Sequence, residues 1–88
     1  MKLSKIHISL DFKKSYGRLP HNIQTLADKK DIWFRENPFD QRLKTHKLKG
    51  ELLDFWAYSV NYQYRILFRF LDNNEVIYYD IGTHEVYR

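Results

Sequence analysis

The sequence contains no cysteine, which excludes disulfide bonds and any cysteine-based metal site. Three glycines and two prolines are all that interrupt its 88 residues, and no repeat or flexible linker divides them. No apolar run approaches the roughly 20 residues of a membrane span, and the N-terminus lacks the apolar segment of a signal peptide. We therefore expect one domain, residues 1–88, located in the cytoplasm and not associated with a membrane.

Aromatic side chains are abundant, at 17% of residues, so a dense core or a partner can stabilise this small domain. Charge is unevenly spread, because residues 1–49 carry a net charge of +7 and residues 50–88 carry −3. A basic half indicates an anionic partner such as nucleic acid or an acidic protein segment. It is equally compatible with a solvated helix surface.

The N-terminal half has the pattern of a strand followed by two helices. Alternating apolar residues over positions 5–10 indicate a half-buried strand, after which Ser9 or Asp11 can cap a helix. Apolar residues at helical spacing predict a short helix ended by Pro20. A second helix is expected to stop by Asn37, because Pro38 disfavours helical geometry in the residue before it.

From residue 55 onward the apolar period changes to two, which predicts three antiparallel strands. The turn between the last two strands falls at residues 72–74, where Asp and Asn tolerate left-handed geometry. The fold class is therefore α+β, in the order β-α-α-β-β-β, with the helical hairpin on one face of a small sheet. Ile66, Phe68 and Phe70 are expected to face the helices, which leaves Arg65 and Arg69 on an exposed face.

Two segments that contain histidine suggest a site. Residues 42–50, "RLKTHKLKG", hold four cationic side chains and no acid, and the chain ends in "GTHEVYR". No two histidines have the three- or four-residue spacing of a helical metal site, so no metal is expected.

The helical hairpin, "HKLKG", "YRILF" and the terminal "GTHEVY", in this order, resemble the RelE/ParE superfamily of bacterial type II toxins, most of all the RelE-type mRNA interferases. The resemblance covers nearly the whole chain. It implies a microbial-RNase-like fold and a toxin that cuts mRNA in the ribosomal A site by attack of a 2′-hydroxyl on the adjacent phosphate. It also implies a cognate antitoxin that wraps the toxin in a small hetero-oligomer.

The resemblance also implies where the site lies. The catalytic candidates are His46, Lys47, Arg65, His84 and Tyr87, and the RNA-binding candidates are Arg42, Lys44, Lys49 and Arg69. Some relatives with the same "GTH" ending carry a further histidine and an aspartate near positions 59 and 63. This chain has Ser59 and Gln63 there, so it departs from that many-histidine form of the site.

Cleavage of RNA by its own 2′-hydroxyl needs a base, an acid and fixed positive charge, but no metal or cofactor. Histidine suits proton transfer near neutral pH, and the planar fork of arginine suits a phosphate. We expect His46 or Lys47 to assist deprotonation and Arg65 to hold the phosphate. We expect His84 with Tyr87 to serve the leaving group or to stack a base.

Two alternatives remain open at this point. One is a ParE-like toxin that inhibits DNA gyrase by binding, and the other is a non-catalytic basic module that binds RNA or an acidic protein. A gyrase inhibitor has no need of His46, Arg65 and His84 around a phosphate. A binding module would lose affinity when charge is removed, but would show no steep loss from one histidine.

Overall fold

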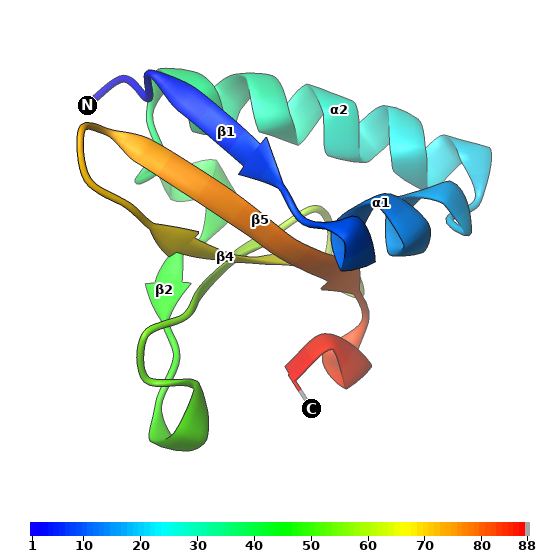
Figure 1. The fold of residues 1–88 in the computed structure, drawn as a ribbon. Coiled ribbons are helices and arrows are strands. Elements are labelled where there is room, and N and C mark those ends of the chain that lie inside the picture. Colours follow the sequence, from blue (N-terminus) through cyan, green and yellow to red (C-terminus); the bar gives the residue numbers. More distant parts are fainter. Residues whose placement is uncertain (88) are drawn as a thin grey trace.

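A computed structural model describes residues 1–87, apart from the side chains of Glu85 and Tyr87. Within this range two α-helices lie on one face of a five-stranded sheet (Figure 1). The elements follow in the order β1 (Lys5–Ile8), α1 (Leu10–Gly17), α2 (His21–Glu36), η1 (Gln41–Leu43), β2 (His46–Lys47), η2 (Gly50–Leu52), β3 (Trp56–Ser59), β4 (Arg65–Phe70), β5 (Glu75–Gly82) and η3 (His84–Tyr87), where η marks a short 3₁₀-helix. The α+β class predicted from the sequence is confirmed.

The strand order across the sheet is β1-β5-β4-β3-β2. β1 runs parallel to β5, and the other pairs are antiparallel. The sheet has one strand more than the sequence predicted, because two residues of the basic connection, residues 42–50, pair with β3 as β2. A strand this short has no side-chain alternation by which it could be recognised.

The helix ends follow the local chemistry of the sequence. The hydroxyl of Ser9 accepts a hydrogen bond from the Phe12 amide at 3.0 Å and donates one to the Tyr79 carbonyl at 2.7 Å. Ser9 therefore caps α1 and ties its start to β5 at the same time. α2 begins directly after Pro20 and ends before Asn37, so the predicted end of this helix is confirmed.

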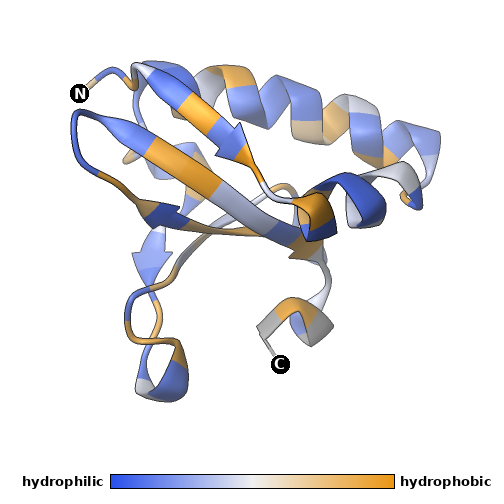
Figure 2. Cartoon of the chain, in the orientation of Figure 1, coloured by the Kyte–Doolittle hydropathy of each residue, from blue (hydrophilic) through white to orange (hydrophobic). Residues whose placement is uncertain are grey.

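The core lies between α2 and the inner face of the sheet. Phe34 of α2 is fully buried, and its ring centroid lies 4.5 Å from that of Tyr58 and 4.8 Å from that of Phe68. Truncating such a residue to alanine typically costs about 3–5 kcal/mol. Hydrophobic residues recur at intervals along α2 between hydrophilic ones, as a helix with one buried face requires (Figure 2). None of the helices within residues 1–87 is both long enough and apolar enough to span a membrane.

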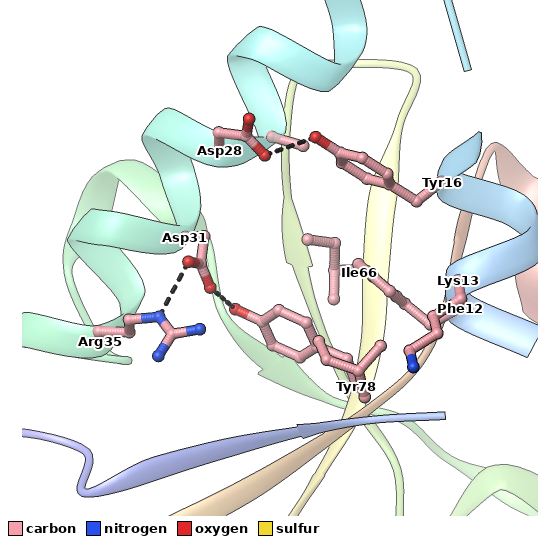
Figure 3. Close-up of a pocket in the computed structure, with 10 residues that line it drawn as sticks. Phe12, Lys13, Tyr16, Asp28, Asp31, Arg35, Ile66 and Tyr78 are labelled. Carbon is pink, nitrogen blue, oxygen red and sulfur yellow. Dashed lines mark hydrogen bonds and ion pairs between the residues drawn. The ribbon is translucent and has the colours of Figure 1, made fainter. Parts of the chain in front are cut away.

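A chain of polar side chains crosses this core (Figure 3). The Tyr78 hydroxyl donates to Oδ1 of Asp31 at 2.7 Å, and the Tyr58 and Tyr78 hydroxyls lie 2.8 Å apart. Because the single proton of Tyr78 goes to Asp31, Tyr58 must donate to Tyr78. Arg35 donates to the other Asp31 oxygen at 2.9 Å. These hydrogen bonds fix the position of α2 on the sheet in addition to the apolar contacts of the core.

Candidate functional site

The face of the sheet turned away from the helices carries several predicted site residues. His46 is paired with Ala57, and Ala57 in turn with Leu67, across three strands. Residues directly opposite each other in an antiparallel pair share a face, so His46 lies on the outer face. Arg65 shares that face, because it lies two residues before Leu67 on β4. Two strand spacings separate the rows of His46 and Arg65, a distance of about 10 Å.

The outer face is less exposed than the sequence predicted. Leu67 is buried, and both Arg65 and Arg69 are half-buried. η3 folds back onto this face, since a Cβ built on Gly82, the β5 partner of Arg65, would lie 3.8 Å from the Cβ of the buried Val86. The expectation of an exposed Arg-Leu-Arg face is therefore wrong for Leu67, which is buried, and the C-terminal turn covers the same face next to Arg65.

His46 and Lys47 lie on opposite faces of the sheet. Lys47 pairs with Trp56, whose ring packs against Phe70 on the side of the helices. Nδ1 of His46 lies 3.0 Å from the carbonyl oxygen of Lys44. A carbonyl oxygen only accepts, so Nδ1 carries the proton and the neutral ring keeps its lone pair on Nε2. Of the two candidate bases, His46 is the one that shares a face with Arg65, and its tautomer suits a base.

Arg65 and the C-terminal turn lie at the same end of the sheet. Arg65 is paired with Gly82 of β5, and η3 starts two residues further on, at His84. The His84 side chain is exposed. The side chain of Tyr87 lies outside the described part of the chain, so its predicted role stays a prediction. Arg65 Nη1 donates to the Tyr62 carbonyl over 3.4 Å, a long bond that leaves most of the guanidinium donors for another acceptor.

A cavity of about 270 Å³ brings together three of the predicted residues with a fourth cation. Its lining includes Arg42, Lys44 and Arg65, together with Lys30 of α2, Ser59 at the end of β3 and residues 60–62 of the turn to β4. We call it the cationic pocket. Among the side chains that the structure describes, no acidic one lines it, and Lys30, Lys44 and Arg65 form no ion pair. Such a cavity suits a singly or doubly charged anion.

Arg42 is held in place at this pocket by two neighbours. Its Nε donates to Oδ1 of Asp40 at 3.0 Å and its Nη2 to Oδ2 at 2.8 Å, which is a two-point fork. The guanidinium carbon lies 3.6 Å from the centroid of the Trp33 ring. The hydrogen bonds from Arg42 lower the pKa of the Asp40 carboxyl to about 2, so the pair stays ionised at neutral pH. One guanidinium nitrogen, Nη1, takes no part in the fork.

The remaining predicted residues lie away from the cationic pocket. Lys49 is exposed at the start of η2, on the loop that hangs below the sheet (Figure 1). Arg69 lies four residues along β4 from Arg65 and places its guanidinium 5.9 Å from the Phe55 ring. The predicted set is therefore spread over both faces of the sheet, with Lys47 on the helix side, and the cationic pocket brings Arg42, Lys44 and Arg65 together.

A second cavity, of about 290 Å³, lies on the helix side between α1, α2 and β5 (Figure 3). Both of its carboxylates already have partners: Asp28 accepts from Tyr16 at 2.7 Å, and Asp31 accepts from Tyr78 and Arg35. Among the described residues no group of three or more histidine, aspartate or glutamate side chains is placed to hold a metal ion. The cationic pocket therefore fits anion chemistry better than this cavity does.

Lys30 is the pocket residue that the sequence did not single out. Its position on α2 is one of several outward cations, and only the packing of the helix selects it. Burial, and then the nearby charges of Lys29 and Arg42, lower its pKa. A half-buried cation close to other cations is a signal of an anion site, but it becomes visible only with the structure.

Comparison with solved structures shows that this architecture is similar in fold to YoeB/ParE, RelE and YoeB toxins. The YoeB/ParE toxin from Agrobacterium tumefaciens matches with a TM-score of 0.77, over 91% of this chain and 98% of that one, at 17% identity. RelE in the archaeal RelE–RelB complex from Pyrococcus horikoshii matches with a TM-score of 0.74, over 94% and 96%, at 14% identity. The YoeB dimer from Staphylococcus aureus matches with a TM-score of 0.72, over 96% and 99%, at 17% identity. No protein-family model and no curated protein sequence matches the chain.

Proposed function

We propose that this chain is the toxin of a bacterial type II toxin–antitoxin system and that it cuts mRNA on the ribosome in the cytoplasm. The proposal is supported by the likeness in fold to RelE and YoeB toxins over almost the whole chain. The observation that supports the proposal most strongly is the cationic pocket, in which Arg65 of β4 lies with Arg42 and Lys44 of the basic connection. That pocket gives an RNA phosphate a place next to the outer face on which His46 lies.

The reaction that these residues support is a transesterification within the RNA. The 2′-oxygen attacks the adjacent phosphorus, the bond from phosphorus to the 5′-oxygen breaks, and the products are a 2′,3′-cyclic phosphate and a 5′-hydroxyl. Nε2 of His46 takes the 2′-hydroxyl proton, which its tautomer allows. Arg65 holds the phosphoryl oxygens as negative charge builds on them. His84, from the turn beside Arg65, returns a proton to the leaving oxygen.

The ribosome is part of this mechanism for a geometric reason. The strands that carry His46 and Arg65 lie about 10 Å apart, so their side chains reach the 2′-hydroxyl and the phosphate of one nucleotide only when the RNA backbone is held in a defined geometry. An mRNA that is held in a bent, splayed form by the ribosome can bring its phosphate and 2′-hydroxyl to both groups at once. Free RNA is then a poor substrate, and the purified protein alone is expected to cut it slowly.

Substitution of single residues tests the proposal. We expect His46→Ala, Arg65→Ala and His84→Ala each to lower the rate of mRNA cleavage in a translation extract by roughly 10²–10⁴-fold. Cleavage is mapped by primer extension on a translated message. His21→Ala is the matched control, because His21 is an exposed histidine at the start of α2, away from the pocket. Full cleavage in all three variants would remove the proposed site.

A gyrase assay separates the main rival. An intact message together with loss of DNA supercoiling would indicate a ParE-like inhibitor, and neither effect would indicate a basic binding module. The module would also lose RNA affinity by similar factors whichever cation is removed, whereas an enzyme loses rate steeply at His46 and His84.

An antitoxin is the proposed protein partner, in a small hetero-oligomer. The Pyrococcus horikoshii RelE was solved in complex with RelB, which supports a partner of that kind here. Among the described strands β1 pairs with β5 alone and so leaves one edge of the sheet open, next to the exposed Ile8 and Leu10. An acidic, partly disordered chain can add to such an edge and neutralise the basic surface. Expression without a neighbouring antitoxin gene is expected to arrest growth, and uninhibited growth with abundant folded protein would contradict toxicity.

A further inference from the structure

An exposed aromatic ring lies at the lining of the cationic pocket. Tyr62, in the β3–β4 turn, is 82% exposed, the highest value among the large hydrophobic residues of the described chain. Its turn is held rigidly: the Asn61 side chain accepts from the amides of Gln63 and Tyr64 at 2.9 Å and 2.7 Å, and the Val60 amide donates to the Tyr64 carbonyl at 2.9 Å. The exposed Tyr62 ring buries little apolar surface, so it contributes little to the stability of the fold.

The pocket itself is prepared for one anionic group. Trp33 is approached by three cations, with Arg42 at 3.6 Å, Lys30 at 4.1 Å and Lys29 at 5.3 Å from its ring centroid. The ring and Asp40 together hold Arg42 against the repulsion of the lysines. Cations gathered this closely without acidic partners on Lys30 and Lys44 leave a positive potential that a phosphate would relieve.

We propose that Lys30, Arg42 and Lys44 of the cationic pocket, together with Tyr62, form a nucleotide-binding subsite for single-stranded RNA, next to the phosphate that Arg65 holds for cleavage. One backbone phosphate enters the pocket between Lys30, Arg42 and Lys44, and the base next to it stacks on Tyr62. Asp40 and Trp33 are positioning residues that hold Arg42 for this contact. The inference rests on the proposed function, since it names how the same substrate is held beside Arg65.

An RNA strand is favoured over an acidic protein segment because of the ring. A carboxylate-rich peptide would interact with the cations but has no group for the Tyr62 ring. A nucleotide has both a charged phosphate for the cations and a flat base that can stack on the ring. Base stacking on an aromatic side chain tolerates any base, so the subsite would add affinity without fixing the sequence that is cut.

The binding experiment uses a 2′-O-methyl RNA hexanucleotide, which cannot be cleaved, with affinity measured by fluorescence anisotropy over a range of salt. Tyr62→Ala is expected to weaken binding roughly 5- to 100-fold, with Tyr62→Phe close to the parent chain. Lys30→Gln is expected to reduce the slope of log affinity against log salt by about 0.7, because one phosphate contact is lost. Lys14→Gln is the charge-matched control, since Lys14 is exposed on α1, which packs on β5.

Asp40→Asn gives a test of opposite sign. If Asp40 only neutralises Arg42, removing its charge tightens RNA binding; if it positions Arg42, as we infer, binding weakens in spite of the extra net positive charge. A thermal melt checks that each variant is folded. Tighter binding in Asp40→Asn would overturn the positioning role. Parent-like affinity in Tyr62→Ala, or preferential binding of a glutamate-rich peptide over the RNA, would overturn the subsite.

The two proposals can fail separately. If the parent chain cuts mRNA on ribosomes while the Tyr62 and Lys30 variants bind the hexanucleotide as it does, the subsite is wrong and the proposed function stands. If binding depends on these residues but no message is cut, the subsite stands and the nuclease does not.

Discussion

The buried hydroxyl chain of Tyr58, Tyr78 and Asp31 leads to a prediction about stability that depends on the direction of each bond. Tyr58 donates to Tyr78 over 2.8 Å, and Tyr78 donates to Asp31 over 2.7 Å. Tyr58→Phe removes the first donor and leaves the second bond intact, so we expect a loss of about 1 kcal/mol in the free energy of unfolding. Tyr78→Phe instead leaves the fully buried Tyr58 hydroxyl without its acceptor. We expect that variant to lose about 2–3 kcal/mol, the bond plus the cost of burying an unpaired donor.

The double variant isolates this effect. With both hydroxyls replaced, no orphan donor remains, so the double loss should fall short of the summed single losses by about 1 kcal/mol. Equilibrium urea unfolding of the four proteins measures these values, provided that the m-values agree. Equal losses in the two single variants, or strict additivity, would refute the assigned direction of the bonds.

Three further predictions follow from local geometry. Burial, and then the hydrogen bond to Asp28, raise the pKa of Tyr16 to about 12, above the usual 10. The contribution of the protonated Tyr16 to stability is therefore present below pH 10 and lost as the pH rises towards 12. Between pH 9 and pH 11, the melting temperature should fall more for the parent chain than for Tyr16→Phe. Lys44 has a φ of 53°, so Lys44→Gly should raise the free energy of unfolding by about 0.5–1 kcal/mol and still weaken RNA binding, whereas Lys44→Ala should weaken binding with no gain in stability. Asn74 has a φ of 58°, so Asn74→Val should cost about 1–2 kcal/mol in urea unfolding, and a near-neutral result would contradict the turn geometry.

The helices and long strands could be predicted from the sequence because each rule for them acts over a few residues. Pro20 and Pro38 bound α2, and the alternation of Ile66, Phe68 and Phe70 placed β4 with its apolar face to the helices. The left-handed turn was readable from its two asparagines, both of which have positive φ. These signals belong to the backbone preferences of single residues and to the periods of helix and strand.

The features that could not be predicted from the sequence depend on contacts between residues that are far apart along the chain. β2 exists because the edge of β3 offers hydrogen bonds, whatever the side chains of His46 and Lys47 are. The same pairing separates these two neighbours onto opposite faces, which their adjacency in the sequence concealed. Lys30 and Tyr62 joined the candidate site only once α2 and the β3–β4 turn had been packed together, so neither carries a local signal.

The place of β5 in the sheet makes assembly of this domain all-or-none. β5 is the last strand in the chain, yet it lies between β1 and β4, and those two have no pairing with each other. Until residues 75–82 form β5, β1 has no strand to pair with. The remaining strands can form only an antiparallel sheet in which one edge of β4 is unpaired. A chain synthesised only as far as β4 lacks the C-terminal turn beside Arg65. Any nuclease activity would therefore appear only after β5 is made and paired, and would not increase gradually during synthesis.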